Sequence, residues 1–86
     1  MKEIRFSKLK SERLKKVRGV SFEELLNARL ICIREHPVKK AQYIMFYEHR
    51  GYVWNVPFIE DQDHIFLKTL YPSRKHTKMH RRGELL

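Results

Sequence analysis

Four short β-type segments between residues 30 and 70 constrain the fold more than any other feature of this sequence. Hydrophobic residues recur with the period of strands in Leu30–Glu35, Gln42–Glu48, Tyr52–Ile59 and Ile65–Leu70. Turn-forming residues lie between these segments, including the turn His49-Arg50-Gly51. The sequence therefore predicts an antiparallel meander of four strands.

The region before the meander carries signals for one further strand and a first helix. Glu3–Phe6 alternates polar and apolar residues, and Ser7 is a suitable helix N-cap. A basic helix is predicted from about Lys8 to Val17, with three apolar residues on one arc, namely Leu9, Leu14 and Val17.

A second helix has the clearest local signal in the chain. Ser21 and Glu24 have the spacing of a capping box, in which each residue satisfies a backbone donor of the other. Val20 and Leu25 lie at the positions of a hydrophobic staple around that cap. A short helix from Phe22 to about Ala28 follows.

The C-terminal region is predicted to form a third helix. Pro72 and Ser73 open this helix of about ten residues, and Gly83 ends it. The predicted order is strand, two helices, four strands and one helix. We expect a single α+β domain over residues 1–86, with a small antiparallel sheet on which two N-terminal helices and one C-terminal helix pack.

Positive charge is concentrated at the two ends of the chain. The formal net charge is +9, from 19 Lys and Arg against 10 Asp and Glu. Residues 1–20 hold eight basic and two acidic residues, and residues 68–86 hold six and one. If the two ends meet in the fold, they form one basic patch for a polyanion such as RNA. The alternative is that these side chains only solvate two surface helices.

Other function classes find little support in the sequence. Cys32 is the single cysteine and lies in an apolar run, so it is predicted to be a core residue without a disulfide. The apolar runs are too short for a signal peptide or a spanning helix, so we expect a cytoplasmic protein with no membrane partner.

No cofactor or metal is expected. Motifs for nucleotide hydrolysis, dinucleotide binding and structural zinc are missing. The acidic group Glu60, Asp61 and Asp63 is interpreted as a solvated turn. His76 and His80 have a chelating spacing, but neighbouring Lys and Arg would repel a cation.

The C-terminal region carries the groups that cleavage of RNA needs. That reaction requires a base for the 2′-hydroxyl, cations for the phosphorane and an acid for the leaving oxygen. Suitable side chains cluster between residues 68 and 81, namely Lys68, Tyr71, Arg74, His76, Lys78 and Arg81. A helix would present Arg74, Lys78 and Arg81 on one face, where they could equally contact an acidic protein.

Two stretches resemble a known family. Gly19–Glu24 is similar to the K-H-G-V-S-F-E-E stretch of BrnT-type toxins, with Lys10 at the spacing of an upstream family lysine. Ser73–Thr77 with Arg81-Arg82 is similar to the closing S-A-R-x-A-T-x-x-E-R of that family. The chain thus resembles a BrnT-type toxin of the RelE/ParE superfold.

The resemblance implies a toxin of a type II toxin–antitoxin module. Such a toxin would be a metal-independent endoribonuclease acting on mRNA, neutralised by an antitoxin with which it could form an oligomer. Arg74 and Lys68 would stabilise the phosphorane, and His76 or His64 would move protons. The RNA backbone would be held by basic side chains of both ends, namely Lys75, Lys78, Arg81, Arg82, Lys10 and Lys16.

Three departures from the family pattern and three rival functions remain. Val17-Arg18 stands where the family has Lys-His, Phe6-Ser7 where it has Trp-Asp, and His80 where it has a late Glu. The first rival is a non-catalytic RNA-binding or ribosome-associated protein. The second is a gyrase inhibitor of the ParE type, and the third is a module that binds an acidic protein.

Overall fold

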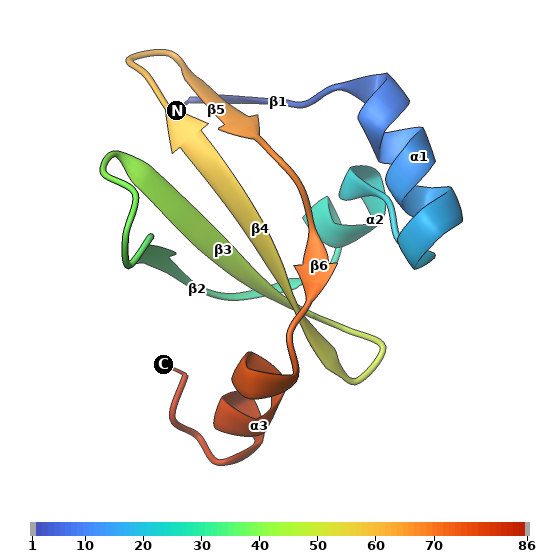
Figure 1. The fold of residues 1–86 in the computed structure, drawn as a ribbon, viewed down its shortest axis with the longest axis vertical. Helices are drawn as coiled ribbons and strands as arrows, with labels where there is room; N and C mark the ends of the chain where they lie inside the picture. The colour runs from blue at the N-terminus through green and yellow to red at the C-terminus, as the bar shows by residue number, and fades with distance from the viewer. Residues whose placement is uncertain (1, 86) are drawn as a thin grey trace.

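The computed structural model describes residues 2–85, which form a mixed sheet of six strands with three helices (Figure 1). Within these residues no helix is long and apolar enough to cross a membrane. The elements in chain order are β1 (Glu3–Arg5), α1 (Lys8–Arg18), α2 (Phe22–Leu26), β2 (Arg29–Glu35), β3 (Gln42–His49), β4 (Tyr52–Glu60), β5 (His64–Leu67), β6 (Tyr71–Pro72) and α3 (Arg74–Arg81).

The sheet has the strand order β1-β5-β4-β3-β2, and its centre is the predicted meander. β3 and β4 form a hairpin in which His49 pairs with Tyr52. Arg50 and Gly51 at its tip have φ angles of 55° and 77°. Positive φ at both central residues is the geometry of a type I′ turn, which matches the twist of the flanking strands. The predicted turn at His49-Arg50-Gly51 is therefore confirmed.

The prediction of a purely antiparallel sheet is wrong at one edge. β1 pairs with β5 in parallel, with Glu3 opposite His64. Two helices and three strands separate β1 from β5 along the chain, so no short turn fixes the direction of this pair. One edge of β5 pairs with β4, and β1 pairs with its other edge.

The predicted strand Ile65–Leu70 ends early, because β5 stops at Leu67 and a separate strand, β6, follows beyond the predicted end. β5 pairs with the segment Phe58–Glu60 of β4, and β6 pairs with Trp54 and Asn55 of the same strand. The break lies opposite Pro57, which has no backbone N–H to donate. Pro72 therefore belongs to β6 and not to the last helix, which is eight residues long and is capped by Ser73.

The predicted helix starts are confirmed at their caps. The Ser7 side chain accepts a hydrogen bond from the Lys10 N–H at 3.2 Å. Ser21 and Glu24 form the complete capping box. The predicted apolar arc of α1 is wrong in part, because Leu9 and Val17 are 78% and 73% exposed. α1 packs on the rest of the molecule through Ser11 and Leu14, so the side chains of Leu9 and Val17 face solvent.

β3 and β4 are buried on both faces, and two separate cores result. On the α1/α2 face, Met45, Tyr47, Trp54, Val56 and Phe58 pack with residues of the two N-terminal helices and with Leu67 and Leu70. On the α3 face, Ile44, Phe46 and Val53 pack with Leu85, Met79 and the half-buried Cys32. Side chains alternate along a strand, so neighbouring residues of β3 and β4 belong to different cores.

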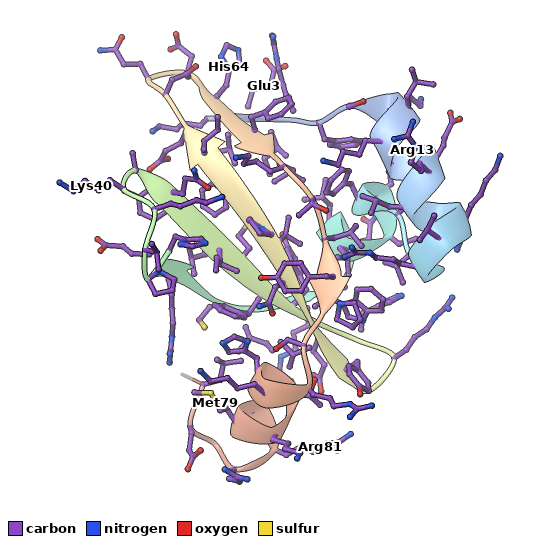
Figure 2. All side chains as sticks on the ribbon, viewed as in Figure 1. Glu3, Arg13, Lys40, His64, Met79 and Arg81 are labelled. Atoms are coloured by element: carbon purple, nitrogen blue, oxygen red, sulfur yellow. The ribbon has the colours of Figure 1, made fainter. Side chains whose placement is uncertain are left out.

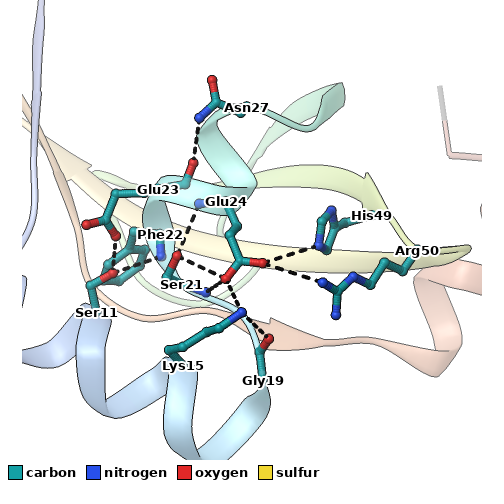
Figure 3. Close-up of polar contacts among 10 residues, drawn as sticks. All are labelled: Ser11, Lys15, Gly19, Ser21, Phe22, Glu23, Glu24, Asn27, His49 and Arg50. Atoms are coloured by element: carbon teal, nitrogen blue, oxygen red, sulfur yellow. Dashed lines mark hydrogen bonds and ion pairs between the residues drawn. The ribbon is translucent and has the colours of Figure 1, made fainter.

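A polar network joins α1, α2 and the β3–β4 turn (Figure 3). The Ser11 hydroxyl donates to Glu23 and accepts from the Phe22 N–H at 3.0 Å. Glu24 receives Lys15 Nζ at 2.6 Å, and its other oxygen lies 3.8 Å from Arg50 Nη2. These contacts hold the two helices against each other and against the hairpin tip.

Candidate functional site

Two hollows flank the short strand β6, one on each face of the sheet. Asn55 pairs with Tyr71 and Trp54 pairs with Pro72. Because side chains alternate, Asn55 and Tyr71 face α3, whereas Trp54 and Pro72 face the side of α1 and α2. The α3-face hollow has a volume of about 350 Å³, and its lining comes from four strands, the β2–β3 loop and one helix, namely Arg34, Glu35, His36, Pro37, Ile44, Phe46, Asn55, Tyr71, Lys75 and His76.

His76 is the most tightly held titratable group in the α3-face hollow. Its Nδ1 lies 2.8 Å from the Ser73 hydroxyl and 3.2 Å from the side-chain amide nitrogen of Asn55. Its ring packs on Phe46, with the ring centroids 4.6 Å apart. Nδ1 is thereby engaged by protein groups, so Nε2 is the ring nitrogen left for a ligand.

The pKa of His76 is lowered from its ordinary value, first by burial of the ring and then by the charges of Lys75 and Arg34. The ring is therefore neutral near pH 7, the state in which it can accept a proton. Arg34 is held in turn by donating from its guanidinium to the backbone carbonyl of Leu85. One hollow thus combines a neutral imidazole with two cations, of which Arg34 is held by a hydrogen bond.

Asn55 is 1% exposed, and its amide oxygen has no hydrogen-bond partner among the described residues. Buried polar atoms are normally paired, so an unpaired one next to a titratable ring requires an explanation. A half-turn of the amide would exchange its nitrogen and oxygen at His76 Nδ1. Nδ1–H would then donate to Asn55 Oδ1, and Nε2 would carry a free lone pair.

The second hollow, the α1/α2-face hollow, has a volume of about 450 Å³. It lies at the hairpin tip, next to the network of Figure 3. Its lining consists of His49, Arg50, Tyr52, Trp54, Pro72 and Arg74. Arginine and aromatic side chains therefore dominate it.

The four catalytic residues predicted from the sequence are spread over separate places. His76 lines the α3-face hollow, whereas Arg74 lines the hollow on the other face. Lys68 lies between β5 and β6, where its N–H donates to the Pro57 carbonyl, and it lines neither hollow.

His64 lies far from His76. It begins β5 opposite Glu3, and its Nδ1 is 3.5 Å from Asp61. Figure 2 shows it at the opposite end of the molecule from Met79 and Arg81 of α3. The structure therefore does not bring His64 to the same site as His76.

The predicted RNA-binding side chains are all exposed, but they form two groups. Four belong to α3 and its C-cap, namely Lys75, Lys78, Arg81 and Arg82, and two belong to α1, namely Lys10 and Lys16. Figure 1 shows α1 and α3 at separate corners of the molecule. The prediction of one continuous basic patch depended on the two ends meeting, and these six side chains lie on separate helices.

Arg34 and Asn55 were not predicted from the sequence as site residues. Arg34 lies in a strand that was predicted, but nothing in its neighbours indicates that it faces α3. Asn55 did carry a signal, since it is a lone amide inside the apolar run of β4. An amide at such a position is buried only if it is paired.

Potential metal ligands do not converge in the part of the chain that the structure describes. Residues 2–85 contain no group of three or more His, Cys, Asp or Glu side chains that could hold a metal ion. His76 faces Ser73 and Asn55, and His80 Nε2 lies 3.5 Å from Glu48.

Comparison with solved structures finds a similar backbone. The ribonuclease toxin BrnT of Brucella abortus superposes with a TM-score of 0.55 over 85% of this chain and 97% of the BrnT chain, at 16% sequence identity. The chain has a BrnT-like fold. The expectation drawn from the two terminal motifs is thus confirmed for the fold. No protein-family model matches the sequence, and no curated protein matches it.

Proposed function

We propose that this chain is the toxin of a toxin–antitoxin pair and acts as an endoribonuclease. The carrying observation is the half-buried His76, held at Nδ1 and flanked by Lys75 and Arg34 in one hollow. The BrnT-like fold and the net charge of +9 support the same class of substrate, because a strongly basic surface attracts polyanions.

His76 is proposed as the base that removes the 2′-hydroxyl proton of the RNA. For this role its Nε2 must be unprotonated, so Nδ1 must carry the ring proton. The buried oxygen of Asn55 is the acceptor that would hold that proton. The 2′-oxygen then attacks the adjacent phosphorus and the bond to the 5′-oxygen breaks, which gives a 2′,3′-cyclic phosphate and a free 5′-hydroxyl.

Arg34 and Lys75 are proposed to stabilise the phosphorane. Both are cations that line the hollow of His76, and a cation placed where charge develops stabilises the transition state. Tyr71 lines the same hollow, and its hydroxyl would donate the proton to the leaving 5′-oxygen. All these steps use side chains of this chain, so the proposed mechanism is independent of metal.

Arg74, Lys68 and His64 receive other roles. Arg74 lies across β6 and would contact the RNA beside the cleaved phosphate. Lys68 and His64 lie outside the hollow and are assigned no chemical step. The exposed cations of α3 would hold the RNA backbone near the hollow, and an antitoxin would silence the toxin by covering this region.

Single-turnover cleavage of one defined RNA in the presence of EDTA tests the proposal. We expect the wild-type chain to cut it and to leave a cyclic phosphate. Lys75→Ala should slow the cut by about a hundredfold, the scale of losing one fixed group that stabilises the transition state. Lys40→Ala removes the same charge from the exposed β2–β3 loop and serves as the matched control (Figure 2).

Three outcomes would count against the proposal. RNA bound with strong salt dependence but left intact would favour a non-catalytic RNA-binding protein. Intact RNA together with altered DNA topology would favour the gyrase alternative. Equal losses in Lys75→Ala and Lys40→Ala would show that the site of cleavage lies elsewhere. In cells, induction of the chain should arrest growth, and co-expression of its antitoxin should restore it.

A further inference from the structure

The α1/α2-face hollow combines two kinds of surface, one suited to the base of a nucleotide and one suited to its phosphate. One part of its wall is apolar or aromatic, formed by Tyr52, Trp54 and Pro72. The other part is basic, formed by Arg50, Arg74 and His49. Bases stack on aromatic faces, and guanidinium groups bind phosphate bidentately.

Two buried polar atoms in residues of this wall have no hydrogen-bond partner among the described residues. They are the indole Nε1 of Trp54 and Nε2 of His49. Trp54 is only 8% exposed, so water does not readily satisfy its N–H. His49 Nε2 is 3.9 Å from Glu24, which is beyond hydrogen-bonding distance. Unpaired polar atoms in two residues of one wall set this hollow apart from an ordinary surface depression.

Arg50 is available to a ligand although it lies near a carboxylate. Its Nη2 is 3.8 Å from Glu24 Oε2, and its side chain is 70% exposed. The other oxygen of Glu24 is bound by Lys15 at 2.6 Å. An exposed ion pair at such a distance contributes little, so a phosphate can displace the carboxylate.

The backbone at Arg50 has a conformation that an arginine does not favour. It is the first central residue of a type I′ turn, with φ of 55°. Asn, Asp and Gly are favoured there, because other residues are strained at positive φ. An arginine at this position brings a cation to the hollow at a cost to the hairpin.

We propose that the α1/α2-face hollow binds one nucleotide, with the base against Tyr52 and Trp54 and the phosphate on Arg50 and Arg74. That this nucleotide belongs to an RNA substrate rests on the proposed function. β6 pairs only with β4 among the described strands, so it is an edge of two residues between the two hollows. An RNA strand that crosses this edge would have its cleaved phosphate in the α3-face hollow and the neighbouring nucleotide in the α1/α2-face hollow. The α1/α2-face hollow would then set a base preference for cleavage.

Trp54 is the single tryptophan of the chain, so its fluorescence and its indole N–H resonance report on this hollow alone. Each of the four nucleoside monophosphates is titrated, with ribose 5-phosphate and inorganic phosphate as probes that lack a base. We expect at least one nucleotide to quench the fluorescence and to shift the indole resonance. The two probes without a base should need at least about tenfold higher concentrations, since they lose the stacking contribution.

Arg50→Asn and Arg74→Gln should each weaken nucleotide binding by about tenfold, the size of one lost charge-assisted hydrogen bond. Arg50→Asn should at the same time raise the melting temperature, because Asn-Gly is the preferred type I′ pair. A purely structural role of Arg50 predicts the higher melting temperature with unchanged affinity. Arg13→Gln removes one charge from the exposed part of α1 and is the matched control for net charge (Figure 2).

The outcomes separate this inference from the proposed function. Nucleotide binding by a chain that leaves RNA intact supports the hollow and refutes the endoribonuclease. RNA cleavage with no response of either Trp54 signal overturns the hollow and leaves the endoribonuclease standing. Equal binding of nucleotides and inorganic phosphate, or unchanged affinity in both arginine variants, also overturns it. If both proposals hold, Arg50→Asn should reduce the base preference of cleavage beside the cut.

Discussion

The two faces of the sheet use the same central strands for different purposes. On the α1/α2 face, two helices close a core that contains Phe22 and Leu25, which are 0% and 1% exposed. On the α3 face, a single short helix and Leu85 close a smaller core and leave the hollow of His76 open. His76, whose pKa is lowered, lies on the face that only the short helix α3 covers. On this face the short cover leaves His76 at a hollow that a ligand can enter.

The polar networks of the two faces differ in the same way. Between α1 and α2, the Ser11 hydroxyl both donates to Glu23 and accepts from Phe22, so its bonding capacity is used. Next to α3, the Asn55 amide meets His76 through one atom and leaves the other unpaired. A saturated network fixes structure, whereas an unsaturated one can change its partners during a reaction.

The largest expected effect tests the difference between the two cores. Phe22→Ala should lower the free energy of unfolding by about 3–5 kcal/mol, because it removes a fully buried ring from the larger core. Leu85→Ala should cost about 2 kcal/mol, the low end for a buried leucine, because its core is smaller. Urea unfolding followed by circular dichroism measures both, and equal losses would contradict the ranking.

The two histidines predicted from sequence give the next largest effect. His76→Gln should lower the single-turnover rate of RNA cleavage by about a hundredfold or more, the usual contribution of a positioned base. His64→Gln should change it less than about twofold, because His64 lies outside the hollow. A comparable loss of cleavage rate in both variants would contradict this assignment and support the site predicted from the sequence, which included both histidines.

Asn55→Asp sharpens the comparison of the two networks. A carboxylate only accepts hydrogen bonds, so it would force the ring proton of His76 onto Nδ1 and favour the imidazolium. We expect the pKa of His76, which is lowered in the wild type, to rise, and the acidic limb of the pH–rate profile to move to higher pH. An NMR titration of the His76 ring checks the same shift.

Asn55→Leu is the control for that experiment. It removes the acceptor without adding charge, so the rate should fall across the whole pH range. A pH–rate profile that has the same midpoint in Asn55→Asp as in the wild type would show that Asn55 has no role in positioning His76.

The smallest expected effect concerns the saturated network. Ser11→Ala leaves the buried Phe22 N–H unpaired and should lower stability by about 1–2 kcal/mol at pH 7. The hydrogen bond from Ser11 is the main cause that lowers the pKa of Glu23. A lowered carboxyl pKa gives stability that is present above the unfolded value of about 4.5 and is lost as the pH falls through the folded pKa.

Melting temperatures between pH 7 and pH 3 measure this effect. The wild type should lose stability steeply below about pH 4.5, and Ser11→Ala should lose less over the same interval. Identical slopes in the two proteins would mean that the Ser11–Glu23 contact does not contribute to acid sensitivity.

Local signals predicted much of the fold. The capping box of Ser21 and Glu24 and the turn at Arg50-Gly51 formed where expected, because each depends on residues within about four positions. The break of the fourth strand was missed, although Pro57 in its partner strand carried the reason. Of the candidate site, Tyr71 and His76 belong to the predicted C-terminal cluster and line one hollow. Arg34 and Asn55 come from strands whose facing the sequence left open.

The sequence by itself determined the kinds of elements, the helix caps, the hairpin turn and the excess of positive charge. Only the tertiary structure decided that β1 runs parallel to β5, that α1 and α3 stay apart, and that His64 and His76 lie at opposite ends. It also decided that Arg74 and His76, two residues apart in sequence, line hollows on different faces of the sheet. The physical reason is that propensity and capping act over one turn, whereas strand order and facing depend on which distant apolar surfaces are buried together.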